Sequence, residues 1–323
     1  MSRMVSRRSF VKQSAMLGVS SVLGADLLTG ETPRQRQWNG AGIRAAPGYQ
    51  GHSAISVATG QDYIDNTIGA VEQLGGMGQF VPEGARVAIL ANPQRPNPGA
   101  FTRPDIVRGV VRMCKGAGAD QVACISWQPE QSWEATGTAE VLTAEGGELV
   151  IVDLRDESLF EPTPIPNGIA LTEARLMKAL ADYDVLISVP ITKDHAGNKF
   201  TGTLKNLMGL NSPVSNREFH MDNWTTDIGA ITHLDQCVAD LNTIIRPDLC
   251  VVDATEFITT NGPFGPGELI RPHKIIAGTD RVAIDSYCCG LWGLNPLDIM
   301  TITKAHEHGL GEIDLARVNV IGA

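Results

Sequence analysis

From His52 onward, short apolar runs alternate with longer stretches in which apolar residues recur at helical spacing. The short runs predict buried strands, at Ala54–Ala58, Arg86–Leu90, Gln121–Ile125, Leu149–Asp153, Val185–Val189, Leu249–Asp253 and Val318–Ile321. The longer stretches predict helices, at Asp62–Leu74, Asp105–Lys115, Ile228–Ile245, Arg281–Leu291 and Pro296–His308. Strands that alternate with helices form a mostly parallel sheet with helices on both faces. We therefore expect an α/β fold, built either as one large domain or as two lobes.

The composition agrees with a sizeable core. The chain has 323 residues, of which 43% are hydrophobic and 5% aromatic, and no apolar run reaches the ~18 residues that span a membrane. A formal net charge of -10 argues against general binding to nucleic acid or anionic membranes, since both are negatively charged. None of the six cysteines belongs to a CxxC pair, so neither an iron–sulfur cluster nor a structural zinc site is expected. We expect the cysteines, the adjacent Cys288 and Cys289 included, to be buried free thiols.

The beginning of the chain carries a targeting pattern. An arginine pair within Ser6–Lys12 precedes a moderately apolar stretch at Ala15–Ala25. Basic residues ahead of a short apolar region are typical of a signal peptide, and the paired arginines indicate the twin-arginine translocase as a partner. We expect a signal peptide over residues 1–30, a linker over 31–50 and the α/β domain over 51–323. The pattern predicts export to the periplasm, with membrane anchoring if the signal is not cleaved.

Polar residues that follow the predicted strands are the first candidates for a functional site, because ligands of parallel sheets bind outside the carboxyl ends of the strands. Asn92 follows the strand at Arg86–Leu90, and Asp253 ends the strand at Leu249–Asp253. We expect Asn92 to contact a ligand. Asp253 is expected to act in catalysis, by binding a substrate hydroxyl or a metal ion, or else to be an ordinary structural carboxylate at a strand end.

The polar segment after the strand at Val185–Val189 carries the densest set of candidates. Lys193 and His195 lie in its loop, and Lys205 and Asn206 fall in the first turns of a helix that follows. Lysine and asparagine side chains near a helix N-terminus suit a carboxylate or a phosphate. His195 is expected to transfer a proton or to bind a metal, with Lys193 as its catalytic neighbour. The alternative is a solvated loop whose charges hold no ligand.

Three further candidates follow the strand that ends at Asp253. Gly262 and Gly267 lie in a Gly- and Pro-rich loop and permit close backbone approach to a ligand. Asp285 lies inside an apolar helix, where a buried carboxylate needs a partner, so a structural and a ligand-binding role stay equally open for it. The sequence selects no particular metal or cofactor, and it lacks the GxGxxG, GxxxxGK[ST], GxSxG and HExxH motifs.

The remaining histidines carry weaker signals. His220 and His233 lack the spacing of a metal-binding pair, and His306 and His308 are two positions apart on a predicted helix, so they face apart. We expect His306 and His308 at the surface, and we assign no role to His220 or His233.

In its specific segments the chain resembles the bacterial and archaeal family named domain of unknown function 362, over roughly Pro82 to Gly322. The matching segments are Val189-Pro190 through Lys193 and His195, Gly202–Gly209, Arg246–Leu249, Val252-Asp253, Gly262–Gly267, Asp280–Asp285 and Gly309–Gly311. The resemblance implies the fold and the position of the site rather than a reaction. Some relatives add ferredoxin-like iron–sulfur segments, whose cysteine cluster this chain lacks, so the resemblance carries over no redox role.

The chain also departs from the family pattern. Ile191 stands where the family usually has a lysine, Asp194 where it has a threonine, and the lysine usual near Asn92 is missing. A site that has lost cationic groups is expected to bind an anion more weakly than in relatives, or to bind something else.

Two hypotheses about function stand at this point. In the first, the protein is an enzyme, with or without a cofactor, that acts on a small anionic ligand at the carboxyl edge of the sheet. In the second, it is a non-catalytic protein that binds a small ligand or a partner, or a family member that has lost its activity. The first requires the polar residues at the strand ends to gather around one cavity; the second predicts the same gathering without a catalytic arrangement, or an exposed apolar face instead. The oligomeric state is left open.

Overall fold

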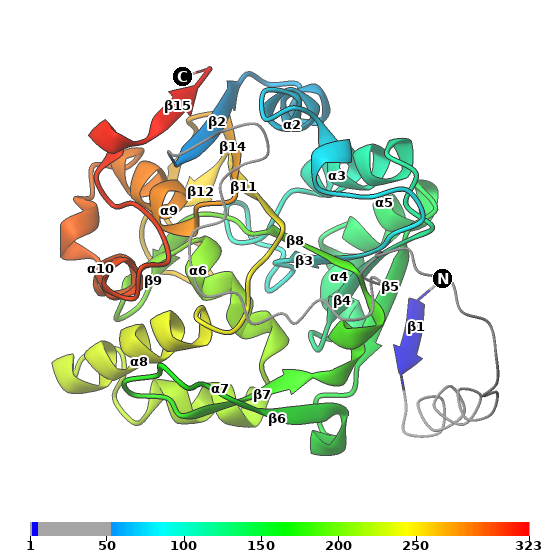
Figure 1. Cartoon of the computed structure of the whole chain (residues 1–323). Coiled ribbons are helices and arrows are strands. Elements are labelled where there is room, and N and C mark those ends of the chain that lie inside the picture. The colour runs from blue at the N-terminus through cyan, green and yellow to red at the C-terminus, as the bar shows by residue number, and fades with distance from the viewer. Residues whose placement is uncertain (1, 6–52, 323) are drawn as a thin grey trace, which may run out of the picture.

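The computed structural model describes residues 2–5 and 53–322 of the chain (Figure 1). The predicted signal peptide and linker therefore lie almost entirely outside the described residues. From that region only β1, Ser2–Val5, is described, as a short strand that pairs in parallel with β5.

The domain is built on a nine-stranded sheet, with the strand order β1-β5-β4-β3-β8-β11-β14-β2-β15. Besides β1, its strands are β2 (Ala54–Thr59), β3 (Arg86–Ala91), β4 (Gln121–Ser126), β5 (Glu148–Val152), β8 (Val185–Val189), β11 (Leu249–Ala254), β14 (Lys274–Gly278) and β15 (Asn319–Ile321). All neighbours pair in parallel except β14, which is antiparallel to both β11 and β2. The predicted mostly parallel α/β sheet is thus confirmed.

The chain changes direction within the sheet at β3. From β3 it proceeds through β4 to β5 on one side, and the later strands β8 and β11 lie on the other side of β3. Parallel sheets bind ligands at such a switch point, because the connections leave the two neighbouring strands in opposite directions and open a crevice between them. The carboxyl ends of β3, β4 and β8 border this crevice.

Helices cover both faces of the sheet (Figure 1). They are α2 (Tyr63–Glu72), α3 (Pro104–Gly116), α4 (Glu130–Ala135), α5 (Thr138–Ala144), α6 (Thr203–Asn206), α7 (Pro213–His220), α8 (Ile228–Leu241), α9 (Arg281–Gly290) and α10 (Met300–Glu307). Side chains alternate along each strand, so Val87 and Ile89 pack into the core beneath α2 and α3. Ala88 and Leu90 instead pack into the core formed with α8, α9 and α10. These two apolar layers enclose the sheet.

Smaller elements complete the domain. Three two-stranded antiparallel pairs join β6 (Phe160–Pro164) to β7 (Glu173–Met177), β9 (Lys193–His195) to β10 (Lys199–Thr201), and β12 (Phe257–Ile258) to β13 (Leu269–Ile270). Short 3-10 turns lie at Met77–Gln79, Glu157–Leu159, Lys178–Asp182, Leu207–Leu210, Pro296–Asp298 and Leu315–Arg317. Within residues 2–5 and 53–322, no helix combines the length and the apolar character needed to cross a bilayer.

Most predicted elements are present with small shifts at their ends. The strand at Val185–Val189 has the predicted bounds, and the helix predicted over Asp105–Lys115 is α3, with Pro104 in its first turn. The helix predicted over Pro296–His308 is divided, because the turn at Pro296–Asp298 ends before α10 starts. All six cysteines are buried free thiols, as expected.

Candidate functional site

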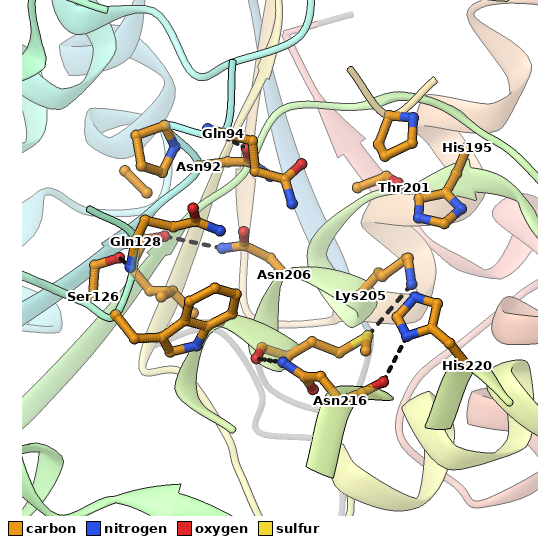
Figure 2. A pocket seen from close by; sticks show the side chains of 17 residues that line it. Asn92, Gln94, Ser126, Gln128, His195, Thr201, Lys205, Asn206, Asn216 and His220 are labelled. Atoms are coloured by element: carbon orange, nitrogen blue, oxygen red, sulfur yellow. Dashed lines mark hydrogen bonds between the residues drawn. The ribbon is translucent and has the colours of Figure 1, made fainter. Parts of the chain in front are cut away.

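A cavity of about 170 Å³ opens at the carboxyl ends of β3 and β4, next to α6 (Figure 2). Its wall includes Asn92 and Gln94, which follow β3, and Trp127, which follows β4. Lys205 and Asn206 reach it from α6. Of the polar residues predicted near the strand ends, Asn92, Lys205 and Asn206 therefore share one cavity with His195, at the place where the order of the strands reverses, whereas Asp253 does not line it.

Asn206 ties α6 to the sheet. Its side-chain nitrogen donates hydrogen bonds to the Leu90 carbonyl oxygen and to Ser188 Oγ, both at 2.9 Å. Leu90 belongs to β3 and Ser188 to β8, so this amide bridges the two strands on either side of the switch point. Asn206 thus lines the cavity and also fixes α6 to β3 and β8.

Asp285 holds the beginning of α6. Its carboxylate accepts hydrogen bonds from the Thr203 amide at 2.7 Å, from Thr203 Oγ1 at 2.8 Å and from the Leu204 amide at 3.1 Å. A Cβ at Gly202 would lie 2.3 Å from Asp285 Oδ1, so only glycine admits this approach. Burial raises the pKa of Asp285 to about 6, although the hydrogen bonds from Leu204 and Thr203 oppose the shift. Asp285 lies outside the cavity wall and positions the helix that carries Lys205.

Lys205 is the charged residue on the cavity wall. Its side chain is buried, and the one hydrogen bond described for its Nζ is to Met208 Sδ at 3.4 Å. Burial lowers its pKa to about 8, against a favourable interaction with the carboxylate of Asp235. Asp235 itself accepts hydrogen bonds from Asn198 Nδ2 at 2.9 Å and from Thr301 Oγ1. No aspartate or glutamate is among the described residues that line the cavity.

Lys193 lies one contact behind the wall. It is fully buried, and its Nζ donates to the Ala100 carbonyl oxygen at 2.6 Å and to Gln94 Oε1 at 3.2 Å. Gln94 lines the cavity, so Lys193 fixes the orientation of a cavity residue. Burial, followed by repulsion from Lys205, lowers the pKa of Lys193 to about 7.

Two histidines face the cavity with the same hydrogen-bonding pattern. His195 Nδ1 lies 2.7 Å from the carbonyl oxygen of Ala196, and His220 Nδ1 lies 2.6 Å from that of Asn216. Because a carbonyl only accepts, each Nδ1 carries the hydrogen and each Nε2 keeps a lone pair. Burial and then Lys205 lower the pKa of His195 well below its usual value, and the same causes lower that of His220 to about 4. Both rings are therefore neutral at pH 7.

The indole ring of Trp224 contacts both imidazoles. Trp224 lies with its ring centroid 5.2 Å from that of His195 and 4.8 Å from that of His220, the latter edge to face. These contacts restrict both rings and keep their Nε2 atoms in fixed directions.

Two polar groups on the wall lack a partner. Thr201 Oγ1 and the indole nitrogen of Trp127 are buried without a hydrogen bond to any described residue. Buried polar atoms are nearly always paired, and each unpaired one costs about 1–3 kcal/mol. Both groups are donors, so a ligand with acceptor oxygens would satisfy them.

The other predicted site residues lie outside the wall. The Asp253 carboxylate accepts hydrogen bonds from the Arg103 amide at 2.8 Å, and from the Thr255 amide at 3.0 Å and hydroxyl at 2.7 Å. It therefore joins the end of β11 to the start of α3. Ideal Cβ atoms at Gly262 and Gly267 would lie 1.8 Å and 1.9 Å from the carbonyl oxygens of Asp194 and Thr260, respectively. The close approach expected of these glycines is thus to the protein's own backbone.

Of the predicted site residues, the structure brings His195, Lys205, Asn206 and Asn92 to one wall, with Lys193 directly behind it. Asp253, Asp285, Gly262 and Gly267 support the surrounding loops. The catalytic roles of His195, Lys193 and Asp253 stay predictions. Sequence reasoning placed none of His220, Gln94, Trp127 and Thr201 in the site. For His220 the spacing to other histidines was the wrong signal, because its partner His195 lies on a different element.

The described part of the chain contains no group of three or more histidine, cysteine, aspartate or glutamate side chains arranged to hold a metal ion. The two imidazoles would supply at most two such ligands.

Comparison with known proteins adds the following. The fold is similar to a solved lactate racemase apoprotein from Thermoanaerobacterium thermosaccharolyticum, at 17% identity and a TM-score of 0.43, over 80% of this chain and 56% of that one. The chain is 28% identical over 180 residues to thylakoid-associated protein sll1697 of Synechocystis sp. (strain ATCC 27184 / PCC 6803 / Kazusa). That match covers 52% of this chain and 54% of the relative, so the chain spans about half the length of the curated relative. The family model described as Domain of unknown function (DUF362) matches residues 87–290, well over half of the chain, and the protein belongs to this family.

Proposed function

We propose that the protein is an enzyme that binds a small organic anion in the cavity beside α6 and moves a proton on it. The observation that carries the proposal is the composition of the wall: one buried lysine and two neutral imidazoles face a cavity lined by no described carboxylate. Cations without acids select an anion, and a neutral imidazole with a free Nε2 accepts a proton.

Electrostatics favours an anionic ligand. Lys205 lines the cavity and Lys193 lies behind it, while the chain as a whole has a formal net charge of -10. A unit charge at ~4 Å from an ammonium gains about 4 kcal/mol at an effective dielectric constant of ~20. The unpaired donors at Thr201 and Trp127 add hydrogen bonds that favour oxygen atoms.

The size of the cavity limits the ligand. An apolar cavity of ~150 Å³ accommodates benzene, with about six non-hydrogen atoms. The cavity here, at about 170 Å³, thus suits a short carboxylate rather than a nucleotide or a sugar phosphate.

His195 is placed to accept the proton. Its ring is held by the Ala196 carbonyl and by Trp224, and Lys205 is among the causes of its lowered pKa. A bound anion offsets the charge of Lys205, so binding raises the pKa of His195 toward about 7. A general base is most effective when its pKa lies near the working pH. The base is therefore activated by the ligand itself.

Calorimetric titration with propionate, lactate and pyruvate tests the binding. Exchange of the ligand's C–H hydrogens in D₂O, followed by proton NMR, tests the chemistry. We expect binding and exchange with the native chain, and binding without exchange for His195→Asn. Binding without exchange in the native chain would instead support a non-catalytic binding protein. The low pKa of His220, about 4, favours that alternative, because so weak a base accepts a proton poorly. Absence of binding by all three carboxylates would contradict both.

We also propose that the chain is exported in folded form by the twin-arginine translocase to the periplasm. The support is the Arg7-Arg8 pair and the apolar stretch that follows it. The test is the location of the full chain after cell fractionation, compared with a variant that carries Arg7→Lys and Arg8→Lys. Export of the native chain and retention of the variant in the cytoplasm are expected. Equal location of the two would contradict the proposal.

A further inference from the structure

We propose that the amine of Lys205 forms an imine with the carbonyl carbon of a small oxo acid bound in this cavity. The inference rests on the proposed function and deepens it, because it narrows the ligand from any short carboxylate to one that also carries an aldehyde or ketone group.

The first support is the position of the amine. Lys205 reaches the cavity wall from α6, which Asp285 and Asn206 anchor to α9 and to the sheet. Its Nζ is within hydrogen-bonding distance of a sulfur atom, Met208 Sδ at 3.4 Å, and no described carboxylate lies within 4.0 Å of it as a salt bridge. Thioethers are weak acceptors, so the nitrogen is held in place without being neutralised.

Other lysines of the domain form hydrogen bonds or ion pairs and do not line the cavity. Lys193 donates to the Ala100 carbonyl oxygen at 2.6 Å, and Lys199 pairs with Asp194 at 2.8 Å. Lys304 pairs with Glu307 at 2.9 Å on α10. Lys193 has the lower pKa of the two buried lysines, but its Nζ is bonded to Ala100 and Gln94 behind the wall, whereas Lys205 lines the cavity itself. This separates Lys205 from its neighbours.

The second support is the state of the amine. Burial is a condition under which a lysine becomes a nucleophile, because desolvation disfavours the ammonium form, and for Lys205 it outweighs the opposing effect of the Asp235 carboxylate. The pKa of Lys205, about 8, leaves a usable fraction of free amine near neutral pH. Its charged fraction attracts the carboxylate of the ligand, and its free fraction attacks the carbonyl.

The third support is the pair of proton carriers. Figure 2 shows the end of the Lys205 side chain next to the rings of His195 and His220, and Lys205 is near enough to both to lower their pKa values. Imine formation needs a group that both takes and returns protons. A neutral imidazole with a free Nε2 does both.

The step balances without any further reagent. The nitrogen lone pair attacks the carbonyl carbon, a C–N bond forms, and the C=O π electrons move to oxygen. An imidazole Nε2 takes one proton from the nitrogen and delivers it to this oxygen, which gives the carbinolamine. The same Nε2 then takes the second proton from the nitrogen and delivers it to the hydroxyl, which leaves as water while the C=N bond forms. One amine and one carbonyl give one imine and one water, with no change in oxidation state.

Reductive trapping tests the proposal. The chain is incubated with pyruvate or 2-oxobutyrate and sodium cyanoborohydride, and the product is analysed by intact mass and by peptide mapping. We expect one adduct per chain, located at Lys205, and slower labelling when propionate competes for the cavity. Lys205→Arg is expected to lose the adduct, while the surface control Lys304→Arg keeps it. Circular dichroism establishes that both variants fold, and the mapping of the native chain does not depend on either.

The outcomes separate the two proposals. Calorimetric binding of the oxo acid without an adduct at Lys205 overturns the imine and leaves the anion site standing. Adducts spread over surface lysines, unaffected by propionate, also overturn it. Absence of both binding and adduct overturns the imine and the proposed function together.

Discussion

Replacement of Lys205 by methionine should make the domain more stable while it weakens ligand binding. The pKa of Lys205 falls from 10.5 to about 8, and one pKa unit corresponds to ~1.4 kcal/mol. Burying the charged amine therefore costs the native state on the order of 3 kcal/mol below pH 8. Methionine keeps the length of the side chain and removes that cost. The pKa of about 8 already includes the favourable interaction with Asp235, so we expect a net gain of up to about 3 kcal/mol at pH 7.

The gain has a defined pH dependence. The folded-state pKa of Lys205 lies below the unfolded one, so the unfolded chain binds more protons between pH 8 and 10.5, and native stability rises with pH across that window. The difference between Lys205→Met and the native chain should therefore be largest below pH 8 and vanish above 10.5.

Urea denaturation of both proteins at pH 7 and at high pH measures this difference. Lys304→Met is the matched control, since Lys304 pairs with Glu307 at the surface, and its effect should stay within about 0.5 kcal/mol. The same Lys205→Met protein should bind propionate about 10- to 100-fold more weakly, the value of a hydrogen bond to a charged group. A variant that is destabilised at pH 7 and still binds propionate normally would refute the reasoning, because Lys205 would then be a structural residue.

Further predictions concern pH and the supports of α6 and the loops. Binding of propionate to the native chain should weaken as pH rises through about 8, where Lys205 loses its charge, whereas any residual binding by Lys205→Met should show no such step; calorimetry over this range decides. Asp285→Ala leaves the amides of Thr203 and Leu204 without an acceptor, while Thr203 Oγ1 keeps the Arg281 carbonyl oxygen, and should lower the free energy of unfolding by at least about 2 kcal/mol; a loss under ~1 kcal/mol would show that α6 does not depend on Asp285. Gly262→Ala places a Cβ 1.8 Å from the Asp194 carbonyl oxygen and should cost about 1–3 kcal/mol through backbone displacement, seen as a lower Tm than the native chain. Gly290→Ala is its control, since nothing lies within 4 Å of the added methyl, and equal Tm values for the two variants would count against the close contact.

The strands were the most predictable part of the fold. Val185–Val189 is a continuous apolar run bounded by Asp184 and Pro190, and a buried parallel strand needs no more than this. The antiparallel strand β14, Lys274–Gly278, was missed. Its apolar core Ile275–Ala277 is short, and its pairing with β2 and β11 depends on contacts far along the chain.

The location of the site could be predicted from the sequence, but the set of residues that line it could not. The parallel strands deliver Asn92 and the segment carrying His195 and Lys205 to one edge, as the strand pattern predicts. Asp253 ends a strand in the same way, yet its carboxylate binds the amide of Arg103, 150 positions away in the chain. His220 reaches the cavity because of how α7 packs. Neither arrangement can be inferred from the residues that neighbour Asp253 or His220 in the sequence.

The central claim is that neutral His195 and His220 share an anion-binding cavity with Lys205. Nitrogen-15 NMR of the two imidazoles reads this claim directly, because each ring nitrogen reports whether it carries a proton. We predict two rings at pH 7 with hydrogen on Nδ1 alone, and a change in the Nε2 signal of His195 when propionate is added. Protonated rings in the free protein, or Nε2 signals that do not respond to a carboxylate that calorimetry shows to be bound, would contradict it.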